Sequence, residues 1–124
     1  MSYDINLVDA VTGEVLQLDE SHHMRGGTYA VGGTSEASLN VTYNYSTHFV
    51  RVFPKYTWQI EEGIRSIYGL TGAQSLPVLK AAIALLGDDT DPDYWAATEG
   101  NAKRALIQLQ ALASMRPDGV WQGD

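Results

Sequence analysis

Hydrophobic residues change their spacing midway along the chain, from every second position to every third or fourth. Apolar and polar residues alternate over 3–8 and 38–45, which predicts strands with one covered face. A short apolar stretch over 14–18 follows turn-forming residues, so 3–8 and 14–18 are predicted to pair as a β-hairpin. A short third strand is expected over 28–31, and 48–53 is expected to extend the strand over 38–45.

The strand over 38–45 has the clearest pattern. Side chains that alternate along a strand point to opposite faces of the sheet, so its apolar and polar residues should separate. The apolar face would hold Leu39, Val41, Tyr43 and Tyr45. The polar face would hold Asn40, Thr42, Asn44 and Ser46. Amides and hydroxyls on such a face are suited to contact with a partner.

The second half of the chain has the spacing of amphipathic helices. A first helix is predicted over 56–69 from its i, i+4, i+7 pattern. A second is predicted to end at Gly87, with that glycine in the left-handed conformation. Its N-cap is Ser75 or, alternatively, Thr71, because Pro77 suits only the first turn of a helix.

A third helix is predicted to begin after Asp91, with Pro92 at its first position. Gly100 and Asn101 are expected to bend or break it. Its buried stripe would consist of Trp95, Thr98, Ala102, Ala105, Leu106, Leu109, Leu112 and Ala113. Beyond the helix, the large apolar side chain of Trp121 is expected to fold back against the body of the protein.

These elements predict an α+β protein in which an N-terminal antiparallel sheet of three to four strands is packed by three C-terminal helices. A length of 124 residues suits one domain with a sizeable core. We therefore expect a single domain over 1–124, with a β-rich half over 1–54 and a helical half over 55–124.

Composition narrows the possible functions. The chain contains no cysteine, which excludes disulfides, thiolate metal sites and cysteine nucleophiles. The net charge is −7, and neither 1–20 nor 88–99 contains a lysine or arginine. Direct nucleic-acid binding is not expected, because it needs a basic face. Docking on a basic protein partner is compatible with this charge. A cytoplasmic location without membrane insertion is expected, since neither a signal sequence nor a long apolar run is seen.

The stretch over 22–34 concentrates the candidate chemistry. Two adjacent histidines and an arginine precede the triplet Gly-Gly-Thr, which occurs twice. Backbone amides freed by paired glycines, with a guanidinium beside them, are able to hold an anion, although two tight turns around a short strand explain the same residues. The candidate binding residues here are His22, His23, Arg25, Gly26, Gly27, Thr28 and Tyr29.

Two further groups are candidates for binding. If a helix restarts at Gly100, its free amides together with Lys103 or Arg104 would meet an anion. The polar strand face contributes Asn40, Thr42 and Asn44 to a contact surface. Aromatic residues in the same regions would form either an interaction surface or part of the core. They are Tyr43, Tyr45, Tyr56, Trp58, Tyr94 and Trp95.

Metal binding and catalysis find little support in the residue pattern. The acidic run after Gly87 does not have the spacing of a calcium loop, and it fits the first turn of a helix better. Adjacent histidines such as His22 and His23 do not usually share one metal ion on a strand, and His48 is distant in sequence. No nucleophile motif is present. We therefore predict no catalytic residue, no metal and no cofactor.

Several segments resemble those of a family of small uncharacterised proteins encoded by bacteria, phages and prophages. They read HHMRGGTY (22–29), NVTYNYS (40–46), GIRSIYGLTG (63–72), DYW with TEGNA (93–102) and RPDGVWQGD (116–124). The resemblance covers nearly the whole chain. It implies a phage or mobile-element context, and it transfers no catalytic residue.

Two functional hypotheses follow. The first is a non-enzymatic binding protein, related to phages or mobile elements, that inhibits a host defence protein. The alternative is a sequestering protein or small enzyme that acts on a phosphorylated, nucleotide-like small molecule through Arg25 and Lys103 or Arg104. A homo-oligomer is compatible with both, because a short sheet edge can pair across a two-fold axis.

Overall fold

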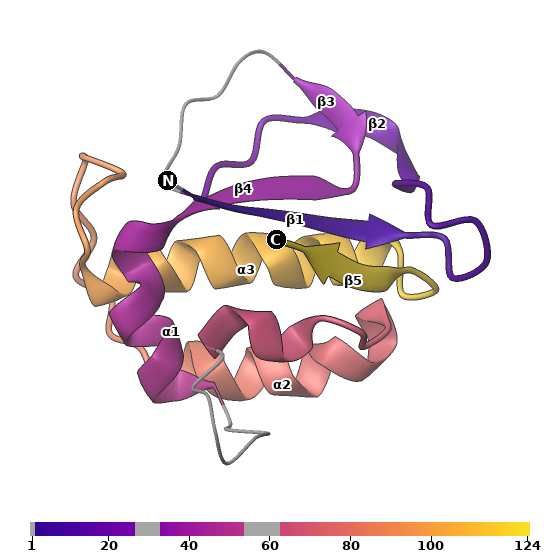
Figure 1. Cartoon of the computed structure of the whole chain (residues 1–124). Coiled ribbons are helices and arrows are strands. Elements are labelled where there is room, and N and C mark those ends of the chain that lie inside the picture. Colours follow the sequence, from indigo (N-terminus) through magenta and orange to yellow (C-terminus); the bar gives the residue numbers. More distant parts are fainter. Residues whose placement is uncertain (1, 27–32, 54–62) are drawn as a thin grey trace.

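The structure is a computed structural model that describes residues 2–26, 33–53 and 63–124. A three-stranded antiparallel sheet lies over the helices (Figure 1). Its order is β4 (Ser38–Thr42), β1 (Ser2–Val8) and β5 (Val120–Gly123). The α+β fold class is confirmed, but the third strand of the sheet comes from the end of the described chain and was not predicted.

Strand β1 lies in the centre of this sheet. Tyr3 is opposite Val41 of β4, and Leu7 is opposite Trp121 of β5. Ile5 and Leu7 are completely buried, as alternation requires for the covered face of a strand. Both edges of β1 are therefore occupied by neighbouring strands.

The predicted hairpin is correct in its turn, but its second strand meets β1 only through an isolated antiparallel bridge between Val8 and Val15. Gly13 has a φ of 75°, the amide of Asp9 donates to Glu14 O (2.8 Å), and the amide of Leu16 donates to Leu7 O (2.9 Å). The chain then enters β2 (Gln17–His22), which pairs with β3 (Thr34–Glu36) in a separate two-stranded sheet. Because β4 and β5 fill both edges of β1, β2 has no place beside it. The strand predicted over 28–31 lies outside the described residues.

The predicted strand over 38–45 ends early, and its predicted extension over 48–53 is a helix. The hydroxyl of Thr42 accepts a hydrogen bond from the amide of Asn44 (3.2 Å) and starts a 3-10 turn. This turn, η1 (Tyr43–Tyr45), leads into α1 (Ser46–Val52). Tyr45, Phe49 and Val52 are buried, so helical spacing replaces the alternation of the strand here.

Helix α2 (Gly72–Ala84) begins at Thr71, the alternative start, so Ser75 is not its N-cap. Thr71 and Gln74 form a capping box with distances of 3.1 and 2.9 Å. Gly87 has no positive φ, so the expected left-handed end is wrong. The helix ends instead through short-range backbone bonds at Leu85 and Leu86.

The described part of the first predicted helix is the 3-10 helix η2 (Gly63–Ile67), while 54–62 lies outside the described residues. Helix α3 (Glu99–Met115) begins at Thr98 and not at Asp91. The hydroxyl of Thr98 accepts from the amide of Asn101 (3.1 Å), which fixes this start. The break expected at 100–101 is therefore the beginning of the helix.

The buried face of α3 agrees with the predicted stripe from Ala102 onward. Its completely or almost completely buried members are Ala102, Ala105, Leu106, Leu109, Leu112 and Ala113. Trp95 precedes the helix and is 37% exposed, so it does not belong to this stripe. Trp121 is completely buried, as expected, and its indole N–H donates to the hydroxyl of Ser75 (2.7 Å). That hydroxyl donates to Gly72 O (2.8 Å), which joins β5 to α2.

The buried Trp121–Ser75 hydrogen bond gives a test of this fold. We expect Ser75→Ala to lower the free energy of unfolding by about 1–3 kcal/mol, because it leaves a buried indole N–H without its acceptor. Ser114→Ala is the matched control, since Ser114 is an exposed helical serine that also donates to a backbone carbonyl. Its effect should stay within about 0.5 kcal/mol. Urea unfolding followed by circular dichroism measures both, and equal effects would contradict the assigned hydrogen bond.

Tyr68 gives a second test, at alkaline pH. Its hydroxyl oxygen is buried and has no hydrogen-bond partner among the described residues. Burial raises the pKa of Tyr68. Below the ordinary tyrosine pKa of about 10 the hydroxyl is neutral in both the folded and the unfolded chain, whereas above it the unfolded chain ionises first and the free energy of unfolding falls. Tyr68→Phe should raise the free energy of unfolding by about 1 kcal/mol at pH 7 and weaken its decline above pH 10. A loss of stability at pH 7 would show that the hydroxyl has a partner.

Candidate functional site

A loop between α2 and α3 carries the aromatic residues Tyr94 and Trp95, and one buried side chain holds it in place. Asn101 is 2% exposed and projects from the first turn of α3. Its amide nitrogen donates to Asp93 O (3.0 Å) and Ala96 O (3.1 Å), and its amide oxygen accepts from the amide of Asp91 (3.0 Å). The backbone on both sides of Tyr94 is thereby attached to the helix.

The acidic run of this loop forms internal contacts. Asp91 and Asp93 accept hydrogen bonds from backbone amides two residues ahead, at 2.8 and 3.0 Å. Asp89 accepts from the amide of Gly100 (3.3 Å), and Asp88 forms an ion pair with Lys103 (2.6 Å). Within the described ranges, no group of three histidine or acidic side chains is arranged to hold a metal ion.

Two arginines from different parts of the chain meet at the ring of Tyr94. The guanidinium carbon of Arg25, beyond the end of β2, lies 5.0 Å from the ring centre. That of Arg104, on α3, lies 5.3 Å from the same centre. Both distances are typical of cation–π contacts. We call Arg25, Tyr94 and Arg104 the Tyr94 cluster.

The Tyr94 cluster rests on the core and keeps its positive charge. The hydroxyl of Tyr45, a buried residue, donates to Tyr94 O. Burial raises the pKa of Tyr45, and the positive charge of nearby Arg104 opposes this rise. No acidic side chain of the described residues forms an ion pair with Arg25 or Arg104. Both arginines are half-buried, and neither guanidinium group has a carboxylate partner within that part of the chain.

The glycine-rich candidate site is only partly described. Gly26 donates its amide to Asn40 O (3.2 Å) and accepts from the amide of Thr42 (2.7 Å), so it binds β4 and not an anion. A side chain at Gly26 would lie 2.5 Å from Asn40 O, which explains the glycine. Three other members of this candidate site, Gly27, Thr28 and Tyr29, lie outside the described residues.

At the start of α3, protein groups occupy backbone amides that were expected to meet an anion. The amides of Gly100 and Asn101 are already bound by Asp89 and Thr98. Lys103 is neutralised by Asp88. The protein's own carboxylates take the place of a ligand here, and only Arg104 of this group joins the Tyr94 cluster.

The polar residues predicted on one strand face have separate roles. Thr42 is completely buried and is therefore not part of a contact surface. Asn40 donates through its side chain to Asp4 of the neighbouring strand. Asn44 donates to Trp95 O (2.8 Å), which brings it beside the loop that carries Tyr94.

Two of the three histidines, His22 and His48, have both ring nitrogens occupied by protein groups. His22 Nε2 donates to Glu36 O (2.8 Å) and His22 Nδ1 accepts from the amide of Met24 (3.2 Å). His23 is exposed and lies against Gly33. His48 Nε2 donates to Ala97 O (2.8 Å). These contacts favour structural roles for His22 and His48.

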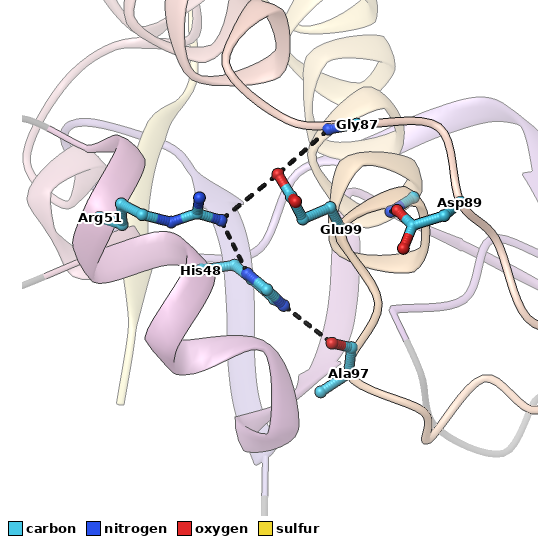
Figure 2. A network of polar contacts seen from close by, with 7 residues as sticks. His48, Arg51, Gly87, Asp89, Ala97 and Glu99 are labelled. Carbon is cyan, nitrogen blue, oxygen red and sulfur yellow. Dashed lines mark hydrogen bonds and ion pairs between the residues drawn. The ribbon is translucent and has the colours of Figure 1, made fainter.

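Figure 2 shows the network around His48, which attaches α1 to the loop before α3. Arg51 donates to His48 Nδ1 (2.9 Å) and lies 3.4 Å from Glu99. Glu99 also accepts from the amide of Gly87 (3.3 Å). The network holds both ends of the loop, so the position of Tyr94 depends on α1 as well as on α3.

Comparison of the chain with protein-family models, curated proteins and solved structures finds no match. In the described part of the chain, no helix has the length and apolar character needed to cross a membrane.

Sequence reasoning identified Arg25 and Arg104 as binding candidates but missed the role of Tyr94 in joining them. One signal was present. Tyr94 and Trp95 follow an Asp-Pro-Asp turn and precede the threonine that caps α3, so they were in position to lie in a loop outside the helical stripe.

The three hydrogen bonds of the Asn101 side chain give a test of how the loop that carries Tyr94 is held. Asn101→Ala should speed amide hydrogen exchange over 91–98 and lower the free energy of unfolding by about 1–3 kcal/mol, because it leaves three backbone groups unpaired. Gln110→Ala, on the same helix, is the control. It should change neither the amide exchange over 91–98 nor the free energy of unfolding strongly. Unchanged exchange over 91–98 in Asn101→Ala would contradict the assigned role.

Proposed function

We propose that this protein is a non-enzymatic binding protein whose Tyr94 cluster holds an acidic region of a partner protein. The observation that carries the proposal is the convergence of Arg25 and Arg104 on one tyrosine ring without an acidic partner among the described residues. Arginine, tyrosine and tryptophan are the residues that most often dominate the binding energy of protein interfaces. The neighbouring Trp95 is 37% exposed and extends the aromatic surface.

The shape of the surface favours a protein partner over a small molecule. A cavity of about 210 Å³ lies beside Arg104, lined also by Lys103 and Asp88. Small-molecule sites usually enclose about 300–1,000 Å³. Asp88 already pairs with Lys103, so one of the two cations that line this cavity has an internal counter-ion.

The histidine contacts support a binding role over an enzymatic one. A general base needs a ring nitrogen that can reach a substrate proton. Both nitrogens of His22 and of His48 are occupied by protein groups.

The sequence resemblance supports a phage or mobile-element origin, and with it a host protein as the partner. Under this proposal the host protein is a component of a defence system, and the Tyr94 cluster occupies an acidic part of its surface. A cytoplasmic location follows from that partnership.

A capture experiment with matched variants tests the proposal. Immobilised wild-type protein, Arg25→Ala/Arg104→Ala and Lys80→Ala are exposed to lysate of the natural host, and bound polypeptides are quantified. Lys80→Ala controls for loss of a cation, since Lys80 is exposed on α2. We expect one polypeptide to bind wild type and Lys80→Ala but to fall by at least about tenfold with the double variant, the effect of about 1.4 kcal/mol.

Other outcomes would overturn the proposal. Equal capture by the double variant would exclude the Tyr94 cluster as the contact. Native mass spectrometry of protein purified from its host gives the second readout. A retained nucleotide-sized mass that disappears on Arg25→Ala would favour sequestration or turnover of a phosphorylated small molecule.

A further inference from the structure

A second candidate surface lies at the other end of α3. A groove of about 570 Å³ runs between β2 and the C-terminal end of that helix. We propose that this groove binds an extended, basic segment of a partner protein. We call it the β2 groove. It is lined by Gln17–His22, Met24, Met115 and Arg116.

The shape of the β2 groove fits an extended segment. All six residues of β2 line it, so it follows the strand along its length. At about 3.3 Å per residue, this length matches an extended peptide of about five or six residues. Strand β2 lies away from the three-stranded sheet (Figure 1), and among the described residues it pairs only with the short strand β3.

Apolar side chains give the groove a hydrophobic contact area. Leu18 and Met24 are partly buried and pack against the core, while Met115 is 48% exposed. Methionine side chains adapt to different apolar partners. An occupant with alternate apolar side chains would cover this area.

The charge of the groove selects a basic occupant. Asp19 and Glu20 are exposed, and none of the described cations forms an ion pair with them. Arg116 compensates for them only in part: it interacts electrostatically with Asp19, but its guanidinium pairs with both carboxylate oxygens of Asp118 (3.1 and 2.9 Å). The last turn of α3 contains no basic residue, so its backbone carbonyls add partial negative charge. Lysine or arginine side chains complement this arrangement.

The β2 groove and the Tyr94 cluster use opposite ends of α3, although Met24 of the groove and Arg25 of the cluster are adjacent in the chain. Arg104 and Met115 are eleven residues apart on α3, which corresponds to about 16 Å along the helix axis. The two surfaces differ in charge, so each can be tested without disturbing the other.

A titration with two synthetic peptides tests the groove. The probes are blocked nine-residue peptides, one alternating lysine with valine and one alternating glutamate with valine. Each is added to ¹⁵N-labelled full-length protein and followed by amide chemical shifts. We expect the lysine peptide to shift the amides of 18–21, Met24 and Met115, and the glutamate peptide to leave them in place.

Charge variants make the test specific. Glu20→Gln should weaken binding of the lysine peptide by about two- to fivefold, the range for a single exposed ion pair. Glu14→Gln removes one equivalent charge from the exposed turn before β2, outside the groove, and should leave affinity unchanged. Absence of shifts in the groove, or equal weakening by both variants, would overturn the proposal. Arg104→Ala, which changes the Tyr94 cluster at a distance from the groove, should bind the lysine peptide like wild type, and this separates the outcome from that of the proposed function.

Discussion

A β-strand can pair with only two neighbouring strands, and most of this structure follows from which strands pair with β1. One edge binds β4 and the other binds β5, whose residues are separated from β1 by more than a hundred positions. Strand β2 directly follows β1 in the chain and still cannot pair with it along its length. Leu16 marks the change of direction, because its amide donates to β1 at Leu7 while its carbonyl accepts from Ala37. The chain is therefore directed into the second sheet, and β2 comes to border the groove beside α3.

Helix α3 connects the two candidate surfaces through its fixed start. Thr98 and Asn101 define the first turn and also hold the loop that carries Tyr94. The buried stripe of the helix fixes its rotation against the sheet, so Arg104 reaches the Tyr94 ring and Met115 reaches the groove. A polar side chain that is almost completely buried is costly unless its hydrogen bonds are satisfied. Asn101 meets this condition only with the loop in its observed conformation.

Local patterns predicted the elements that local forces determine. The alternation that forms β1 and β4, and the helical stripe from Ala102 to Ala113, were visible because side-chain burial repeats with the period of each element. Strand β5 was missed because its partner lies at the opposite end of the sequence. The segment 43–53 was misassigned as a strand, since aromatic and β-branched residues have high strand propensity and the turn started by Thr42 outweighs it.

Local sequence patterns also failed to predict how the residues of the candidate site come together. Arg25 and Arg104 were both identified from their charge and their neighbours, but their meeting point depends on a loop conformation that no periodic pattern encodes. Asp91 was predicted as a helix cap because it precedes a proline. In the structure, Asp91 instead stabilises a turn with Asp93, while Thr98 takes the role of the cap. Competing caps of this kind are distinguished by tertiary contacts and not by residue type.

The charges behind the net value of −7 are arranged differently at the two ends of α3, and the first end carries the Tyr94 loop. There, Asp88, Asp89, Asp91 and Asp93 are bound by a lysine or by backbone amides. Lys103 offsets one of these charges, while the backbone amides hold the other three carboxylates in place without neutralising them, so the guanidinium groups at Tyr94 lie near negative groups. At the other end of α3, Asp19 and Glu20 have no such internal partners among the described residues. Positive and negative groups therefore lie together at the start of the helix, whereas acidic side chains prevail in the β2 groove at its other end, so a partner that contacts both ends is oriented by its own charge distribution.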